Sequence, residues 1–389
     1  MTDTASEKVN TRKTRRRRIT ATLLMVAAVL FSVWFMQKFM CIPFSYDEIR
    51  VINLHKEPEN SIDVLLVGSS ATYSDFSSVY AYEKFGFTSF PYAIGGSTCT
   101  MWKPAVKDAL DRQKPKLIIV DVFGGGYDQD LIEKRNNQLS IVMSHTAWSK
   151  EKVKTAEELT ELVSRTSTSS FLFPFIKYHN NVPNCVKTLP DRLRLEFAGP
   201  SPLKGLNTLT RTRQLVDVDP ASFTDESVPL DPKTEEIIVD FINYCKSENL
   251  EVLFVKYPSV LTEGNPDELE VNLRSNRILE IAEENGCHAL NMQQYFHDIG
   301  LKEREDFYNH GHTNTRGQKK VTEFLGNYLV ENMGITPSEL SDSVKDEWDD
   351  SIKYWHAFEA ESEAQTKENA AESFGDEPLV LLQLEKVVE

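Results

Sequence analysis

The stretch SIDVLLVGSS, residues 61–70, decides the fold. Four consecutive apolar residues lead into a glycine and two serines, which is the pattern of a buried strand that ends in a tight turn. Three other stretches are similar: KPKLIIVDVFGGG at 114–126, NLEVLFVKYP at 249–258 and the shorter GCHALNM at 286–292. Strands this apolar are typical of a parallel sheet that is covered on both faces.

Helical patterns lie between or after these strands, in residues 101–113, 233–248, 268–284 and 315–332. Alternating strands and helices predict right-handed βαβ units. The expected fold is therefore α/β, with a central parallel sheet between two layers of helices.

Residues 129–231 break this rhythm. They contain polar helix-like pieces, several prolines and the aromatic patch SSFLFPF at 169–175. We interpret the segment as an insertion that caps or walls one edge of the sheet. The folded domain would then span residues 46–335, and the strongly acidic remainder, 336–389, is expected to be a flexible tail.

The run ITATLLMVAAVLFSVWFM, residues 19–36, contains no charged residue. At a rise of about 1.5 Å per residue, it covers most of the hydrocarbon core of a bilayer. Residues 19–40 are predicted to be the transmembrane signal anchor of a single-pass protein. Because the run Arg15–Arg18 precedes it, residues 1–18 should lie in the cytoplasm and the main domain outside. A cleaved signal peptide is the alternative, but no small-residue cleavage site follows.

The net charge and the spacing of the cysteines indicate which kinds of partner and cofactor the chain is not expected to bind. A formal net charge of -16 argues against nucleic acid, because a phosphate backbone selects basic protein faces. The five cysteines show no CxxC or metal-binding spacing, and no metal or other cofactor is predicted.

Loops rich in glycine and serine adjoin the strands at residues 68–71, 92–100 and 122–128. In open α/β sheets, ligands bind beyond the carboxyl ends of the strands. Such loops let backbone N–H groups point into one crevice, which is what an oxyanion requires. Each serine also has an ordinary explanation, because serines at these positions commonly cap helices.

The stretch DFYNHGHTNTRGQKK, residues 306–320, places His310 and His312 just before a helix. A serine at a strand end and a histidine from a late loop can act as nucleophile and general base. Capping and surface solvation are the ordinary roles of such histidines. His310 is interpreted as a substrate-side or solvent-facing residue, because an H-x-H metal pair would have no further ligand cluster near it.

Taken in order, these motifs resemble the SGNH (GDSL-type) hydrolase superfamily over residues 61–329, and in particular a membrane-anchored bacterial branch related to surface-polymer O-acyltransfer proteins. The resemblance implies a three-layer, flavodoxin-like sandwich. It also implies that VLLVGSSATY carries the nucleophile, Ser70, and that the last block carries the base, His312. The implied oxyanion and substrate-binding residues, besides the backbone of Ser70, are Gly68, Ser69, Gly95, Gly96, Thr98 and Gly125.

The chain departs from the family pattern at several places, and two of them lie in the second block, where Ala93 replaces the usual asparagine and the glycine expected near Thr98 is absent. Asn309 stands three residues before His312, where the family has an aspartate. Its carbonyl can orient the imidazole but cannot stabilise the imidazolium by charge, and Asp306 is the nearest carboxylate that could substitute. The third block has Gly125 or Gly126 in place of the family's asparagine. Loss of one oxyanion donor costs roughly 2.7–4 kcal/mol.

Two functional hypotheses follow. The first is an extracytoplasmic, membrane-tethered serine esterase or O-acyltransferase that acts on acyl groups of a cell-envelope polysaccharide or related polymer, or on a small acyl compound. If acyl transfer is the role, the resemblance implies a multi-span membrane acyltransferase as a partner. The second hypothesis is a catalytically weak or inactive domain that serves as a glycan-binding or assembly module.

Overall fold

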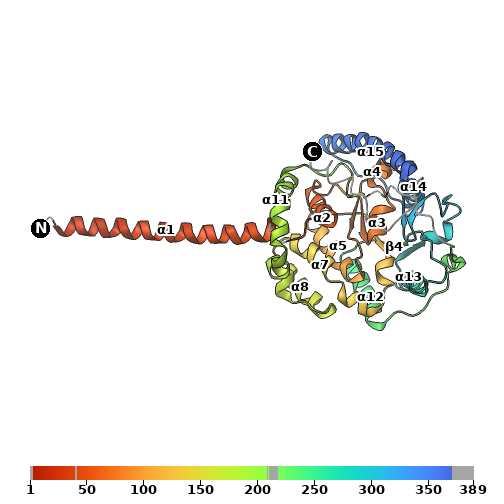
Figure 1. Ribbon diagram of the computed structural model, residues 1–389, viewed down its shortest axis with the longest axis horizontal. Helices are drawn as coiled ribbons and strands as arrows, with labels where there is room; N and C mark the ends of the chain where they lie inside the picture. Colours follow the sequence, from red (N-terminus) through yellow and green to blue (C-terminus); the bar gives the residue numbers. More distant parts are fainter. Residues whose placement is uncertain (1–2, 40–41, 208, 210–217, 370–389) are drawn as a thin grey trace.

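The computed structural model describes residues 3–39, 42–207, 209 and 218–369, with side chains from residue 14 onward. A central sheet lies among helices in one rounded body, and a single long helix projects from it (Figure 1).

Five strands form the sheet in the order β2-β1-β3-β4-β5, and every neighbouring pair is parallel. They are β1 (Val64–Gly68), β2 (Ser89–Ala93), β3 (Leu117–Asp121), β4 (Val252–Lys256) and β5 (His288–Asn291). The predicted α/β sandwich is confirmed. Because β2 lies on one side of β1 and β3 on the other, the chain reverses its direction of travel across the sheet here. The carboxyl ends of β1 and β3 therefore form the topological switch point.

Strand β2 is the one strand of this sheet that the sequence analysis did not predict. It contains Pro91, which pairs with Leu66 of β1 but has no N–H to donate to a ladder. The structure tolerates proline here because β2 is an edge strand, where one row of N–H groups needs no strand partner.

Alternate residues of β1 point into two different helical layers. Leu65 and Val67 belong to one buried cluster, and Val64 and Leu66 belong to the other. The first layer contains α2 (Tyr46–Lys56), α5 (Trp102–Leu110), α12 (Pro232–Ser247) and α13 (Pro266–Glu284). The second contains α4 (Ser78–Phe85) and α14 (Thr315–Glu331). The four predicted helices correspond to α5, α12, α13 and α14, with ends shifted by no more than three residues.

Three short elements build the edge where the carboxyl ends of the strands lie. Helix α3 (Ser70–Ser74) follows β1 directly, and strands β6 (Phe307–Asn309) and β7 (His312–Thr313) form an antiparallel hairpin before α14. The 3₁₀ turns of the chain are η1 (Cys99–Met101), η2 (Val122–Gly125), η3 (His179–Asn181), η4 (Pro220–Phe223) and η5 (Met292–Tyr295).

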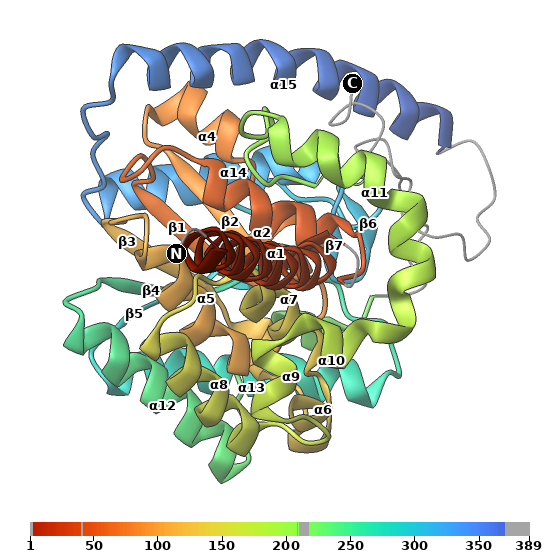
Figure 2. The same cartoon turned by 90° about the vertical axis from the view of Figure 1, so that its left-hand side faces the viewer.

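The predicted insertion is mostly helical. Its helices are α6 (Gln129–Lys134), α7 (Asn137–His145), α8 (Lys150–Leu162), α9 (Thr168–Leu172), α10 (Pro174–Tyr178) and α11 (Val182–Phe197). In the view along the projecting helix, α8, α9 and α10 lie in the lower half of the body and α11 rises along its right-hand side (Figure 2). Helices α7 and α9 pack together, and α7 packs on α2.

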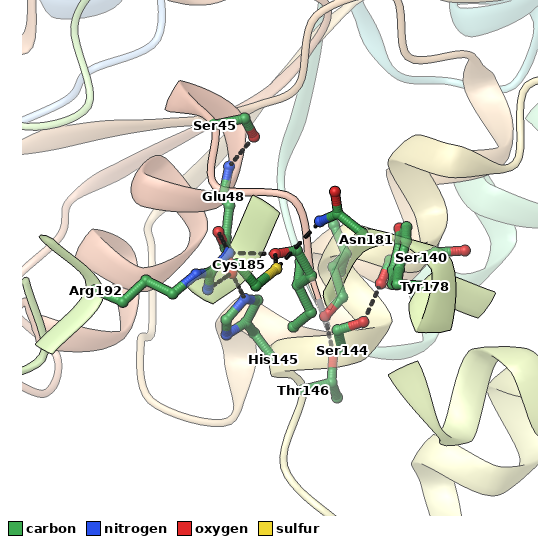
Figure 3. A network of polar contacts seen from close by, with 12 residues as sticks. Ser45, Glu48, Ser140, Ser144, His145, Thr146, Tyr178, Asn181, Cys185 and Arg192 are labelled. Carbon is green, nitrogen blue, oxygen red and sulfur yellow. Dashed lines mark hydrogen bonds and ion pairs between the residues drawn. The ribbon is translucent and has the colours of Figure 1, made fainter. Parts of the chain in front are cut away.

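A buried ion pair joins this insertion to α2. Both guanidinium NH groups of Arg192 lie 2.7 Å from the carboxylate oxygens of Glu48, and neither residue is more than 4% exposed. His145 Nε2 approaches the same carboxylate at 3.2 Å, so that α7 and α11 converge on α2 (Figure 3).

The prediction of a flexible tail is wrong for residues 342–369, because they form helix α15 (Asp342–Asn369). Trp348 and Trp355 are fully buried, and α15 packs against α4 and α14. Two tryptophans seven residues apart face the same side of a helix, so this acidic segment carries an apolar stripe that covers the domain. The apolar end of the chain, residues 379–388, lies outside the described residues.

Helix α1 (Asp3–Phe39) is the projecting rod of Figure 1. Its segment Thr14–Phe39 is long enough to cross a membrane and contains an 18-residue window with a mean hydropathy of 2.2. Large apolar side chains of this segment, such as Leu23, Leu24 and Phe31, are exposed. Near its end, Lys38 pairs with Glu196 of α11.

Removal of Arg192 should destabilise the domain strongly, because the Glu48 carboxylate would stay buried without its main partner. We expect Arg192→Met to lower the free energy of unfolding by about 3–5 kcal/mol in urea titrations of the full chain in detergent. The double variant Glu48→Gln/Arg192→Met is the matched control and should recover most of this loss. A single variant as stable as the wild type would contradict the role of this pair.

Candidate active site

Ser70 stands at the switch point because a buried carboxylate fixes the turn before it. Asp121, the last residue of β3, accepts hydrogen bonds from the backbone N–H of Ser69 at 3.0 Å and from its hydroxyl at 2.5 Å. Gly68 makes this approach feasible, since a Cβ there would lie 2.4 Å from the Cβ of Asp121. The turn therefore ends with Ser70 as the first residue of α3.

The hairpin β6–β7 brings His312 to this serine. His312 Nε2 lies 2.6 Å from Ser70 Oγ, and His312 Nδ1 lies 2.8 Å from Asn309 Oδ1. The two residues that the sequence analysis proposed as nucleophile and base are thus in hydrogen-bonding contact, although 242 residues separate them.

The orientation of the Asn309 amide decides which nitrogen of His312 carries the proton. The backbone N–H of Gly311 donates to Asn309 Oδ1 at 3.0 Å, so the oxygen and not the amino group must face this side. The same oxygen then accepts from His312 Nδ1–H. A neutral imidazole with a proton on Nδ1 leaves Nε2 free to accept the proton of Ser70.

Burial lowers the pKa of His312 to about 4, and the neighbouring His310 acts in the same direction. Asn309 adds no negative charge that would oppose this shift. At neutral pH His312 is therefore uncharged and able to act as a base.

Asp75 ties the two halves of the site together. Its carboxylate accepts from the backbone N–H and the hydroxyl of Thr313, each at 2.9 Å, and Thr313 directly follows His312. Asp75 also ends α3, the helix that begins with Ser70. Burial raises the pKa of Asp75 to about 7.

Of the two residues proposed to orient the imidazole, Asn309 contacts it and Asp306 does not. The Asp306 carboxylate accepts from the backbone N–H of Lys302 at 2.8 Å and from Lys320 Nζ at 2.6 Å. Because these partners lie before the hairpin and on α14, Asp306 supports the hairpin rather than the catalytic pair.

The structure corrects several of the proposed oxyanion donors. The N–H of Ser69 is taken by Asp121, and Gly68 presents its carbonyl oxygen to Ser97 Oγ at 2.7 Å. Gly125 packs in the core, since a Cβ there would lie 2.7 Å from Ile278 Cδ1. These three positions shape the turn and the core, and the N–H of Ser69 already has a carboxylate partner.

The second glycine loop is held by side chains from outside the predicted motifs. The N–H of Gly95 donates to Asp47 Oδ1 at 3.1 Å. Gly96 has a positive φ of 66° and its carbonyl accepts from Arg135 at 2.7 Å. The hydroxyl of Thr98 bonds that of Thr100 at 2.8 Å. Helix α2 and the start of the insertion therefore fix this loop.

Three residues near Ser70 escaped the sequence analysis: Tyr73, Asp47 and Arg50. Burial raises the pKa of the Tyr73 phenol and the Ser70 side chain opposes this rise, and the guanidinium of Arg50 lies 3.7 Å from the centre of the Tyr73 ring. Arg50 in turn donates to Asp47 at 2.9 Å. Of these three, only Tyr73 could have been found from the sequence. It stands three positions after Ser70 in SSATY, and residues three apart share one face of a helix.

A small cavity is lined by the chain neighbours of the pair, Ala71 and Gly311, but not by Ser70 or His312 themselves. It has a volume of about 30 Å³, and its lining includes Ala71, Phe123, Tyr257 and Gly311. Within the described part of the chain, no group of three or more His, Cys, Asp or Glu residues could hold a metal ion.

No protein-family model and no curated protein matches the chain. Among solved structures, a protein assigned to the G-D-S-L lipolytic family from Desulfitobacterium hafniense DCB-2 shares 9% identity and a TM-score of 0.33, over 69% of this chain and 99% of that one. A two-domain esterase (CEX) active on acetylated mannans, co-crystallised with mannopentaose, shares 14% identity and a TM-score of 0.30. That match covers 79% of this chain and 59% of the esterase, so the chain spans less than two thirds of its length. Likenesses this distant carry no information on activity.

The lowered pKa of His312 predicts an unusual pH profile for labelling of Ser70 by a fluorophosphonate. Protonation of His312 removes the base, so the rate should be lost as pH falls through about 4. Between about pH 6 and pH 8 the rate should be flat, whereas an ordinary histidine titrates near 6.5. A midpoint near 6.5, in a sample shown to be folded by circular dichroism, would contradict this assignment.

Asn309→Asp should raise the pKa of His312, because a carboxylate beside Nδ1 favours the imidazolium. We expect the acid limb of the same labelling profile to move up by about 1–2 units, and labelling at neutral pH to become about tenfold to a hundredfold faster. Asn309→Ala is the matched control and should slow labelling, because the imidazole loses its orienting acceptor. An unchanged limb in Asn309→Asp would show that the residue does not contact the base in solution.

Proposed function

We propose that the chain is an extracytoplasmic, membrane-tethered serine esterase or O-acyltransferase that acts on acyl groups of a cell-envelope polysaccharide or related polymer. The observation that carries this proposal is the 2.6 Å contact between Ser70 Oγ and His312 Nε2, with the tautomer of His312 fixed by Asn309. An activated serine of this kind is what acyl transfer requires.

In the proposed reaction, Ser70 attacks the acyl carbonyl carbon while His312 takes its proton. His312 then returns this proton to the departing alcohol, and the acyl group remains on Ser70 as an ester. Water or a sugar hydroxyl attacks this ester in a second step, with His312 again as base. Asn309 holds the imidazole throughout, and the backbone N–H of Ser70 faces the developing oxyanion.

The exposed apolar surface of α1 supports tethering to a membrane. The basic residues before it support a cytoplasmic N-terminus, which would place Ser70 outside the cell. A multi-span membrane acyltransferase would be the source of acyl groups if transfer is the role.

A second candidate is a non-catalytic module that binds a glycan or an assembly partner. It is favoured by the state of two expected oxyanion donors: the N–H of Gly95 is bound to Asp47, and Gly125 lies in the core.

Labelling of the full-length chain in detergent with a fluorophosphonate, followed by intact-mass analysis, separates the two candidates. We expect one adduct, mapped by peptide analysis to Ser70 and not to Ser69, and we expect it to be absent from Ser70→Ala and His312→Ala. His310→Ala is the matched control, because His310 lies two residues away, faces Glu268 and should leave labelling in place. A folded wild type without an adduct would overturn the enzyme and favour the binding module.

A further inference from the structure

Tyr73 lies on the same face of α3 as Ser70. The two residues are i and i+3 in one short helix, so their side chains point in the same direction. The Ser70 side chain is close enough to the phenol to oppose the rise that burial causes in the pKa of Tyr73, and only 7% of Tyr73 is exposed. Tyr73 therefore approaches the reacting serine from inside the protein.

The ring of Tyr73 is held in one position. The Arg50 guanidinium stacks on it at 3.7 Å and is itself fixed by the carbonyl oxygens of Gly205 at 2.8 Å and Ala93 at 2.9 Å. At the hydroxyl end, Gly95 leaves the room that the phenol occupies, since a Cβ there would lie 3.1 Å from the hydroxyl oxygen. This gives Gly95 a steric role, because its N–H is already bound to Asp47.

The phenol keeps its proton at neutral pH. Burial raises the pKa of Tyr73 well above its usual value, and the nearby Asp47 carboxylate raises it further. Arg50 and Ser70 act in the opposite direction but do not reverse the shift. Tyr73 is therefore a permanent hydrogen-bond donor beside Ser70.

We propose that Tyr73 is a catalytic residue whose hydroxyl donates the side-chain hydrogen bond to the oxyanion formed when Ser70 attacks an acyl carbonyl. This inference rests on the proposed function. As the bond between Ser70 Oγ and the carbonyl carbon forms, His312 takes the serine proton and the carbonyl π electrons move onto the carbonyl oxygen. That oxygen is bonded to the same carbon as Oγ, so it becomes the strongest acceptor near the phenol. Tyr73 donates without giving up its proton.

This role supplies a side-chain donor where some of the donors expected from the sequence are not available. The N–H groups of Ser69 and Gly95 already have carboxylate partners, and Gly125 faces the core. A phenol in a water-poor site is a strong replacement, since removal of one preorganised donor typically costs 10²–10³ in rate.

The first test is Tyr73→Phe in the full-length chain, with pre-steady-state acylation by p-nitrophenyl acetate as the readout. The rate constant for acylation should fall by about 10²–10³-fold. The KM should change little, because the hydrogen bond strengthens only in the transition state. Tyr80→Phe is the matched control, since its hydroxyl bonds Glu323 on α14 instead, and its acylation rate should equal that of the wild type.

The second test separates catalysis from packing. Incorporation of fluorinated tyrosines at position 73 keeps the ring and hydroxyl but makes the phenol more acidic, and a more acidic donor binds an oxyanion more strongly. We expect the acylation rate to rise with phenol acidity by a few fold across the series. A purely structural residue would show no such correlation.

The outcomes distinguish this inference from the function on which it rests. A wild type that neither reacts with the ester nor forms the Ser70 adduct would overturn both. A wild type that acylates normally, together with a Tyr73→Phe variant of unchanged rate or a fluorotyrosine series without a trend, would overturn the role of Tyr73 alone.

Discussion

The hydrogen bond from the Gly311 N–H to Asn309 Oδ1 sets the chemistry of the whole site. It fixes the amide so that oxygen faces Nδ1 of His312, and the imidazole must then present an unprotonated Nε2 to Ser70. An asparagine can thus select the same tautomer as an aspartate, although it leaves the imidazolium without charge stabilisation. Burial, with a smaller contribution from His310, lowers the pKa of His312, and Asn309 adds no charge that would oppose this shift, so the imidazole is an uncharged but weak base at neutral pH.

The site is assembled from parts of the chain that are far apart, and α2 connects most of them. This helix begins a few residues after the apolar helix α1, and three residues near its start make these contacts. Asp47 holds the Gly95 loop, Glu48 binds the insertion through Arg192, and Arg50 stacks on Tyr73. The same short segment therefore supports the glycine loop, the insertion and the phenol beside Ser70.

The sequence predicted most of the sheet and the reactive pair because those signals are local. Apolar runs mark β1, β3, β4 and β5, and short motifs mark Ser70 and His312. Edge strand β2 was not predicted because it contains Pro91, and proline is unfavourable in most strands. Helix α15 was not predicted because its buried Trp348 and Trp355 lie in a strongly acidic segment. The oxyanion donors could not be predicted, since whether an N–H is free depends on tertiary partners such as Asp47, 48 residues away from Gly95.

The most direct test of this account is the protonation state of the His312 ring. Nitrogen-15 NMR of the labelled full-length chain at neutral pH, with His312 assigned by its loss in His312→Gln, reports the two ring nitrogens separately. We predict a neutral imidazole with the proton on Nδ1 and an unprotonated Nε2. A ring protonated on Nε2, or a charged imidazolium, would contradict the proposed activation of Ser70.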